Sequence, residues 1–320
     1  MSKEILCNVV DAGARYGLHP SWQPAQDLAC FHLYETDPEE ATRLSEKYAG
    51  SGNIAVHATA LFSRDCSLTF HIRKHRALNS IYDTNRALLE NDRYMAEEHA
   101  ELGTYEVEAA RIDSLYPDGG IHFLKLDTEG AELEILKGAN SCLSDSVLGV
   151  RAEVPFAPIL KDAPSFGDIH AFMLERGFEL LNFDYDGRGS ARSPFTRPER
   201  FGKIMSTDAV WIATRDRLFD GRAQDLRDNC IRQAYFLMLN NATDVALEIL
   251  LLAVRDHGIG FGDLWQDRLF RDLHRRVALL FKEISYQPAM DSALLSTTYR
   301  EIFDRDFPQL NQFYESRLFD

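Results

Sequence analysis

Three acidic side chains follow two apolar segments that we predict to be β-strands. Asp127 and Glu129 come directly after Ile121–Leu126, and Glu153 ends Val147–Glu153. Ligands of open α/β sheets bind beyond the carboxyl ends of the strands, so we expect these three carboxylates to share one site. A carboxylate there can act as a general base toward a hydroxyl group, or several can hold Mg²⁺ through their oxygens. The sequence does not separate these two chemistries, and we assign no metal ligand.

Four other side chains near these segments have simpler explanations. Glu132 and Glu134 fall in the first turn of the helix that follows Glu129, where the helix dipole favours acidic residues. We therefore interpret both as structural. His57 and His122 lie on predicted strands and are weaker candidates for a base, because a lone histidine on a strand more often packs or makes a local hydrogen bond.

A glycine-bearing turn lies at the end of the first predicted strand. The segment from residue 9 to residue 17 reads Val-Val-Asp-Ala-Gly-Ala-Arg-Tyr-Gly. A strand that ends in such a turn and leads into a helix is typical of nucleotide cradles, since the small residues let the backbone approach the ligand and the first helical amides point at it. Glu35 ends the next apolar run, 22 residues beyond Gly13. At that distance an acidic side chain can accept hydrogen bonds from both ribose hydroxyls.

The same loop discriminates between two classes of nucleotide ligand. A dinucleotide site requires a second glycine two positions after the first, to make room for the pyrophosphate. Arg15 stands at that position, and the carboxylate of Asp11 beside the loop would repel a pyrophosphate. S-adenosylmethionine has no phosphate and carries an ammonium and a sulfonium group. The electrostatics of the loop therefore favour this methyl donor over NAD.

The elements that must position these residues form one long region of alternating strands and helices. The pattern runs from residue 5 to about residue 214 and is typical of βαβ units and a parallel sheet. The predicted strands are Ile5–Val10, Cys30–Tyr34, Ile54–Ala60, Ile121–Leu126, Val147–Glu153, Phe178–Phe183 and Ala209–Ala213. We predict an α/β domain over residues 1–215, with a doubly wound sheet.

An insertion separates the third and fourth of these strands. Leu68–Ile72 and Tyr105–Ala109 alternate between apolar and polar residues, which predicts two antiparallel strands. We expect a helix near Arg86–Ala100 between them. The insertion therefore adds a small β-structure to the main sheet.

Helix signals are clear in one place and diffuse in another. Ser165 and Asp168 form a capping-box pattern at the start of a helix over Phe166–Arg176, and Gly177 supplies a left-handed stop. After Arg215, apolar residues recur at helical spacing without a fixed repeat. We predict about four helices in residues 216–320, docked on the α/β domain.

Composition limits the class of protein and its partners. The 320 residues carry 35 basic and 50 acidic side chains, a net charge of −15, which argues against nucleic acid as a partner. The five scattered cysteines form no C-x-x-C pair and indicate reduced, mostly buried thiols. No segment has the length of a signal-peptide core or of a membrane span. We therefore expect a cytoplasmic protein without membrane insertion, and the oligomeric state stays open.

The acidic and glycine-bearing segments together resemble the FkbM family of methyltransferases. The strongest match is Leu124–Asn140, which is similar to the family signature D-x-E-G-A-E-x-x-x-L-x-G. Asp11–Gly17, Tyr34–Pro38 and Arg111–Asp113 match in support, and the resemblance covers roughly residues 5–214. It implies a class I methyltransferase fold, in which the last strand of a seven-stranded sheet is antiparallel. It also implies S-adenosylmethionine as the methyl donor, and a hydroxyl acceptor on a sugar, glycan or secondary metabolite.

Specific roles follow from the resemblance and from the motifs together. Asp127, Glu129 and Glu153 are the candidate catalytic residues. The candidate donor-binding residues are those of the loop and of the next two strand ends: Asp11, Gly13, Ala14, Arg15, Gly17, Glu35 and Ala60. In this assignment Glu35 holds the ribose and Ala60 lies near the adenine. Because the chain begins close to its first strand, we expect the helices of residues 216–320 to cover the donor.

Two other classes of protein stay open. An NAD-dependent dehydrogenase shares the sheet but lacks support from the loop. A catalytically inactive scaffold would act through its helical region and would not need the two acidic segments. The loops at Asn79–Ser80 and Gly187–Arg200 are candidates for shaping the acceptor pocket.

Overall fold

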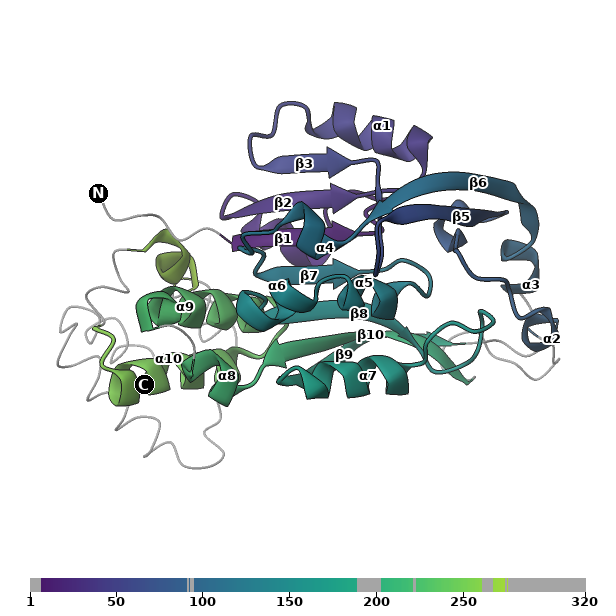
Figure 1. Cartoon of the computed structure of the whole chain (residues 1–320). Coiled ribbons are helices and arrows are strands. Elements are labelled where there is room, and N and C mark those ends of the chain that lie inside the picture. The colour runs from purple at the N-terminus through teal and green to yellow at the C-terminus, as the bar shows by residue number, and fades with distance from the viewer. Residues whose placement is uncertain are drawn as a thin grey trace, which may run out of the picture. The chain divides into compact units, whose positions relative to one another are not determined.

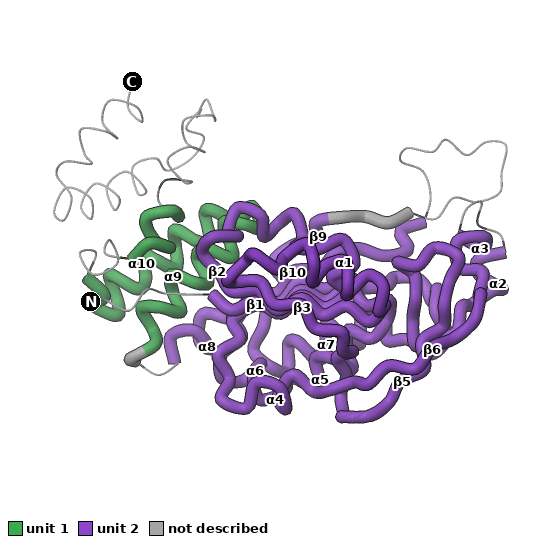
Figure 2. The backbone as a smooth tube through the Cα atoms, turned by 90° about the horizontal axis from the view of Figure 1, so that it is seen from above, with its two compact units in different colours: residues 1–5, 222–320 green, residues 6–221 purple. Residues whose placement is uncertain are grey.

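The chain forms two compact units, which Figure 2 distinguishes by colour. One unit comprises residues 6–221, and the other comprises residues 1–5 together with residues 222–320. The computed structural model describes residues 7–90, 92, 95–188, 203–220, 223–260, 267–273 and 275. The predicted domain boundary after residue 215, and the docking of the C-terminal helices, stay predictions.

A seven-stranded sheet forms the centre of the larger unit (Figure 1). Its strand order is β3-β2-β1-β7-β8-β10-β9. These strands are β1 (Cys7–Ala12), β2 (Ala29–Tyr34), β3 (Ile54–His57), β7 (Phe123–Leu126), β8 (Gly149–Pro155), β9 (Phe178–Arg188) and β10 (Ile204–Ala213). The first five strands of the sheet order are parallel, whereas β10 runs antiparallel to β8 and β9. The antiparallel last strand confirms the predicted fold class.

One face of this sheet packs against four helices through a large cluster of buried apolar side chains. The helices on that face are α4 (Ile112–Leu115), α5 (Glu132–Lys137), α6 (Asn140–Asp145) and α7 (Phe166–Glu175) (Figure 1). Leu124 and Leu126 of β7 and Val150 of β8 point toward these helices and are completely buried. Each such side chain contributes about 1.5–3 kcal/mol relative to an exposed position. This packing fixes the carboxyl ends of β7 and β8 side by side.

Helix α7 begins and ends where the sequence predicts. The Asp168 carboxylate accepts a hydrogen bond from the Ser165 amide at 2.8 Å, and the Ser165 hydroxyl accepts one from the Asp168 amide at 3.4 Å. Gly177 follows the helix with φ +70°, a left-handed conformation that favours glycine. The predicted capping box and stop are both confirmed.

The segment after β1 differs from the prediction. We expected the glycine loop to lead into an α-helix, but it leads into a 3₁₀ helix, η1 (Pro20–Ala25). Pro24, inside this segment, lacks the amide hydrogen that an α-helix would need there, and the His19 side chain accepts a hydrogen bond from the Ser21 amide. Trp22 of η1 packs on Phe123 of β7 with ring centroids 5.8 Å apart. The short helix therefore still covers part of the second face of the sheet.

Two further helical elements follow β2 and β5. Helix α1 (Pro38–Tyr48) begins after Asp37, whose carboxylate accepts a hydrogen bond from the Glu39 amide at 3.1 Å. The 3₁₀ helix η2 (Arg76–Leu78) follows β5. Asp37 has a second role at the cavity described below, so the cap of α1 also belongs to the surroundings of the site.

The insertion forms a separate three-stranded sheet in the order β4-β6-β5. Its strands are β4 (Ala60–Leu61), β5 (Cys66–Arg73) and β6 (Glu101–Ala110), and β5 and β6 are antiparallel as predicted. The predicted third strand, Ile54–Ala60, is wrong at its end. It stops at His57, opposite the last residue of β2, and Ala60 begins β4 instead. The chain changes sheets there because β2 offers no further partner residue.

The helix predicted near Arg86–Ala100 is also wrong. Two single turns replace it, α2 (Arg86–Leu89) and α3 (Met95–Glu98). Asp92 lies between them, and its carboxylate accepts a hydrogen bond from the Met95 amide at 3.0 Å. Aspartate side chains compete with helical backbone bonds in this way, so the interruption follows from the local sequence.

The smaller unit contains α9 (Ala223–Leu239) and α10 (Thr243–His257), and α8 (Arg215–Phe219) precedes it. Other predicted C-terminal helices fall largely on residues 276–320, which lie outside the described residues. Within the described part of the chain, no helix is long and apolar enough to cross a membrane. All five cysteines are free thiols, as predicted.

Candidate active site

A cavity of about 250 Å³ lies at the carboxyl ends of β1, β2, β7 and β8 in the larger unit. Seven of the ten predicted site residues line it: Gly13, Arg15, Glu35, Ala60, Asp127, Glu129 and Glu153. These residues come from segments up to 140 positions apart in the sequence. The sheet order brings them together, because β1 lies between β2 and β7.

The other three predicted residues do not line the cavity. Asp11 and Ala14 are buried, with exposed fractions of 0% and 1%. Gly17 has φ +91° and packs toward α1, where a Cβ atom would lie 2.5 Å from the Tyr48 hydroxyl oxygen. Donor contacts by these three residues stay predictions.

Gly13 shows why the loop requires glycine. Its φ is +77°, and a Cβ atom would lie 1.7 Å from the carbonyl oxygen of Asp127. The amides of Gly13 and Ala14 both donate to the carbonyl of Tyr34, at 3.0 and 3.1 Å. These two amides are therefore used by the fold, in contrast to the expected amides of a helix N-terminus. What the loop provides is close contact between the end of β1 and the end of β7.

Glu35 follows β2 and is buried at the cavity wall. One of its carboxylate oxygens accepts a hydrogen bond from the Asp37 amide at 2.8 Å, and burial raises the pKa of the Glu35 carboxyl. Arg15 also lines the cavity and pairs with the Asp37 carboxylate at 3.1 Å. Arg76 lies 3.5 Å from the same carboxylate. Asp37 thus orients two guanidinium groups beside Glu35.

The three candidate catalytic carboxylates meet at one point of the cavity. One oxygen each of Asp127, Glu129 and Glu153 lies within 4.8 Å of the other two. Glu129 has φ +55° and is followed by Gly130 with φ +101°, so a tight turn directs the chain back after β7. The Ser80 hydroxyl donates to the carbonyl of Glu129 at 2.6 Å and holds this turn.

The electrostatics of these carboxylates are unusual. Burial and the neighbouring charge of Glu153 raise the pKa of Glu129 well above the ordinary carboxyl value. Burial and the charge of Asp127 do the same to the pKa of Glu153. Among the described residues neither glutamate has an ion-pair partner. The two groups therefore retain a proton at a pH where most carboxyls have lost theirs.

Sequence reasoning missed two components of the site. Lys125 of β7 looks like an interruption in an apolar strand, yet its ammonium lies 3.3 Å from the buried Asp11 carboxylate. The insertion supplies an apolar wall with Leu68 and Phe70 of β5 and with Ile81. The alternating pattern of β5 predicted a strand, but it gave no indication of which surface that strand would cover.

The residues interpreted as structural lie where that interpretation predicts. Glu132 is buried, and one of its oxygens accepts hydrogen bonds from the amide and the hydroxyl of Thr128 at 2.7 and 2.9 Å. His57 stacks on Tyr34 with ring centroids 4.6 Å apart. The Nδ1 atom of His122 accepts a hydrogen bond from the Asn8 amide at 2.9 Å. Neither histidine lines the cavity.

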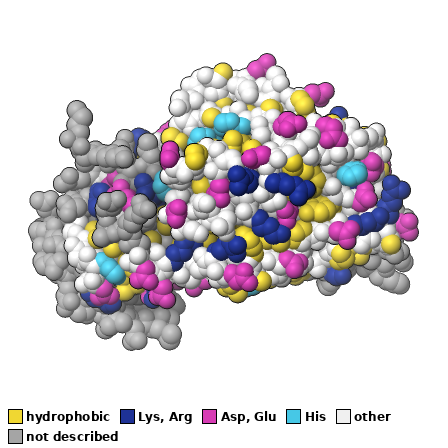
Figure 3. Space-filling view, viewed as in Figure 1, with side chains coloured by type: hydrophobic (Ala, Val, Ile, Leu, Met, Phe, Trp, Pro, Cys, Tyr) yellow, Lys and Arg dark blue, Asp and Glu magenta, His cyan; other side chains and the backbone are white. Residues whose placement is uncertain are grey.

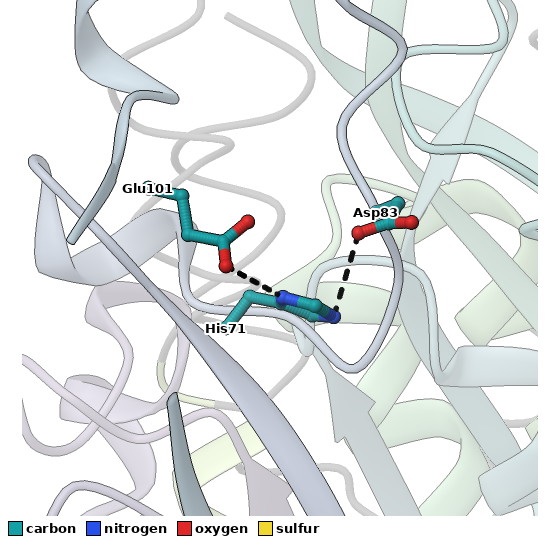
Figure 4. A group of neighbouring side chains, drawn as sticks. All are labelled: His71, Asp83 and Glu101. Atoms are coloured by element: carbon teal, nitrogen blue, oxygen red, sulfur yellow. Dashed lines mark ion pairs between the residues drawn. The ribbon is translucent and has the colours of Figure 1, made fainter. Parts of the chain in front are cut away.

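A second cluster of ionisable side chains lies away from the cavity lining, at the edge of the insertion (Figure 4). The Nε2 atom of His71 is 3.6 Å from Asp83, and its Nδ1 atom is 3.4 Å from Glu101. The other oxygen of Glu101 accepts a hydrogen bond from buried Arg73 at 3.1 Å. Glu101 therefore has a cationic neighbour in Arg73, and the cluster joins β5 and β6 to the loop near residue 83.

Charged side chains of both signs are distributed over the face of the molecule drawn in Figure 3. On the face in Figure 3, acidic side chains are scattered, with small groups of lysines and arginines between them.

A comparison of the sequence with protein families matches residues 11–180 to the methyltransferase FkbM domain. The match covers more than half of the chain, and the chain belongs to this methyltransferase family. The matched region contains every candidate residue that lines the cavity, from Gly13 to Glu153. No curated protein matches the sequence.

Several solved structures are similar in fold at low sequence identity. A precorrin-6y C5,15-methyltransferase from Geobacter metallireducens is 10% identical over 66% of this chain and 83% of its own, with a TM-score of 0.34. An rRNA methylase from Streptococcus thermophilus is 10% identical over 66% of this chain and 89% of its own, with a TM-score of 0.32. The 23S rRNA methyltransferase ErmE is 16% identical over 86% and 92%, also with a TM-score of 0.32. Similarities this low carry no argument about donor or acceptor.

Proposed function

We propose that this methyltransferase uses S-adenosylmethionine to methylate a hydroxyl group of a sugar, glycan or secondary-metabolite acceptor. One observation carries the proposal. Glu35, our candidate for the ribose, lines the same cavity as the group of three carboxylates at the neighbouring strand ends. Glu35 and the three carboxylates come from segments far apart in the sequence, and the sheet brings them to one cavity. This convergence supports a role for these residues in binding a ligand.

The chemistry of the cavity fits the proposed donor. Its lining has four carboxylates, those of Glu35, Asp127, Glu129 and Glu153, and two guanidinium groups, those of Arg15 and Arg76. The carboxyl oxygens of this lining, with the Asp127 carboxylate among them, complement the ammonium and sulfonium groups of S-adenosylmethionine and disfavour a pyrophosphate. Glu35 would hold the ribose, and Ala60 would lie near the adenine. When bound, the donor supplies an activated methyl group.

The residues of this chain would then position the acceptor and accept its proton. In-line methyl transfer depends mainly on alignment, and a hydroxyl nucleophile also gains from a base within hydrogen-bond reach. Glu129 and Glu153 share a raised affinity for protons, so the ionised partner of this pair is a strong base for a carboxylate. The apolar wall of Leu68, Phe70 and Ile81 would exclude water from one side of the acceptor.

Calorimetric titration of the purified chain with S-adenosylmethionine, S-adenosylhomocysteine and NAD tests the proposed function. We expect micromolar binding of the two sulfur compounds and no binding of NAD. Binding of NAD alone would favour a dehydrogenase. If none of the three bound, the donor assignment would be wrong and an inactive scaffold would become the better hypothesis.

A further inference from the structure

Lys125 is a buried cation that pairs with one of the candidate catalytic carboxylates, Asp127. It lies in β7 opposite Asp11 of β1, and its side chain is 6% exposed. Its ammonium is 3.3 Å from Asp11, 3.4 Å from Asp127 and 3.5 Å from the carbonyl oxygen of Gly13. Three oxygens from two strand ends and the glycine loop thus surround one ammonium group, which has three hydrogens to donate.

The charge of Lys125 is held in place by its surroundings. Burial alone would lower the pKa of Lys125, but the carboxylates of Asp11 and Asp127 raise it on balance. Among the described residues, no other cation lies within ion-pair distance of Asp11 or Asp127. The neighbouring cation in the sheet, Arg151, pairs instead with Asp184 and Asp208. Among the described residues, the direct contacts of the Lys125 ammonium are to Asp11, Asp127 and the carbonyl oxygen of Gly13.

An ion pair with only a structural role would need the contact between Lys125 and Asp11, but not the contacts to Asp127 and Gly13. Asp11 is completely buried and by itself balances the ammonium charge, whereas the Asp127 side chain is 45% exposed and lines the cavity. A buried ion pair contributes little stability compared with apolar side chains of similar size. The contacts to Asp127 and Gly13 connect the Lys125–Asp11 pair to the cavity. Among the described residues, Asp127 is the catalytic candidate that has a cationic ion-pair partner.

We infer that Lys125 is a positioning residue, which holds Asp127 and the Gly13 loop in a fixed relation around the amino-acid end of the methyl donor. This inference rests on the proposed function. It assigns different tasks to the carboxylates: Asp127 is fixed and paired, while Glu129 and Glu153 are free to exchange a proton. Among the described residues, Lys125 makes no ion pair or hydrogen bond with Glu35 or Ala60, to which we assign the adenosine end of the donor.

Two ligands separate positioning from simple structural support. S-adenosylhomocysteine has the amino-acid end of the donor, whereas methylthioadenosine has only the adenosine end and a methylthio group. We expect Lys125→Met to weaken binding of S-adenosylhomocysteine by about tenfold or more, the effect of losing one charge-assisted contact. Binding of methylthioadenosine should stay within about twofold of wild type. A structural defect would weaken both ligands together.

The single variant leaves Asp11 buried without its partner and can unfold the chain. The double variant Asp11→Asn with Lys125→Met removes both charges and keeps side chains of similar size, so it should melt closer to wild type. Lys125→Arg keeps the charge and should lose less affinity than Lys125→Met. The inference is wrong if a folded double variant binds S-adenosylhomocysteine as wild type does, or if both ligands weaken equally. If wild type binds neither ligand, the proposed function fails, and the inference fails with it.

Discussion

Two clusters of ionisable side chains in this chain each contain two or more carboxyl groups, but they differ in the charges that lie beside those groups. At the edge of the insertion, the Glu101 carboxylate pairs with the guanidinium of buried Arg73, and His71 lies between Glu101 and Asp83. In the cavity, Glu129 and Glu153 face each other and Asp127 without a cation of their own. The first arrangement stabilises the junction of two strands and a loop. The second costs stability, and such a cost is typical of a site that performs chemistry.

The largest expected effect of breaking this contrast is on turnover. Glu129→Gln and Glu153→Gln remove the proposed base and should each slow methyl transfer by about 100-fold or more. The affinity for S-adenosylmethionine should change by less than about threefold, because Glu35 and the loop stay intact. Formation of S-adenosylhomocysteine with a panel of hydroxylated acceptors gives the rate.

Glu101→Gln is the matched control for these variants, because it makes the same chemical change in the cluster of His71, Asp83 and Glu101 at the edge of the insertion. It should leave turnover close to that of wild type. An equal loss of turnover in Glu101→Gln and Glu129→Gln would show that the contrast between the clusters has no catalytic meaning.

The next largest effect concerns the donor. Glu35→Ala should weaken binding of S-adenosylmethionine by about 10- to 100-fold, because hydrogen bonds to a charged group contribute roughly 1.5–3 kcal/mol. Glu39→Ala, an exposed residue of the first turn of α1, is the control and should bind normally. Equal donor affinity in Glu35→Ala and wild type would contradict the ribose assignment.

Replacing a glutamate by glutamine should change Tm in opposite directions in the two clusters. A glutamate with a raised folded-state pKa favours the fold while it is protonated, and that contribution is lost as the pH rises through the raised value. Glu129→Gln should therefore raise Tm at pH 8 by about 2–4 °C, corresponding to ~1 kcal/mol, and change it little near pH 4. Glu101→Gln should lower Tm at pH 8, because buried Arg73 loses its carboxylate. Thermal melts of both variants at the two pH values decide this, and a lower Tm for both at pH 8 would contradict it.

The smallest expected effect is that of metal removal. If Glu129 and Glu153 act as the base that accepts the proton of the acceptor, exhaustive EDTA treatment should leave turnover unchanged within experimental error. Loss of turnover that Mg²⁺ restores would instead assign Asp127, Glu129 and Glu153 to a metal.

The sequence predicted the parts of the site that depend on strand ends. Asp127, Glu153 and Glu35 could be found because parallel strands that neighbour each other bring their carboxyl ends to one edge. Gly13 could be found because a strand end with glycine indicates a close approach, although the group that approaches is the carbonyl of Asp127. The seven-stranded fold followed from the same alternation of strands and helices.

The parts that depend on contacts between distant segments could not be predicted. Lys125 lies in a strand whose other residues are apolar, and only the register with β1 shows that it faces Asp11. The apolar wall of Leu68 and Phe70 depends on where the second sheet packs, which periodicity does not specify. The segment Arg86–Ala100 forms two single turns instead of the expected helix, because the Asp92 carboxylate accepts a hydrogen bond from the Met95 amide and begins the second turn there.

A crystal structure of the chain with S-adenosylhomocysteine tests the central claim most directly. The account predicts that the ligand occupies the cavity, with its ribose hydroxyls on Glu35 and its sulfur toward Asp127, Glu129 and Glu153. A ligand bound outside this cavity, or inside it with the ribose away from Glu35, would contradict the account.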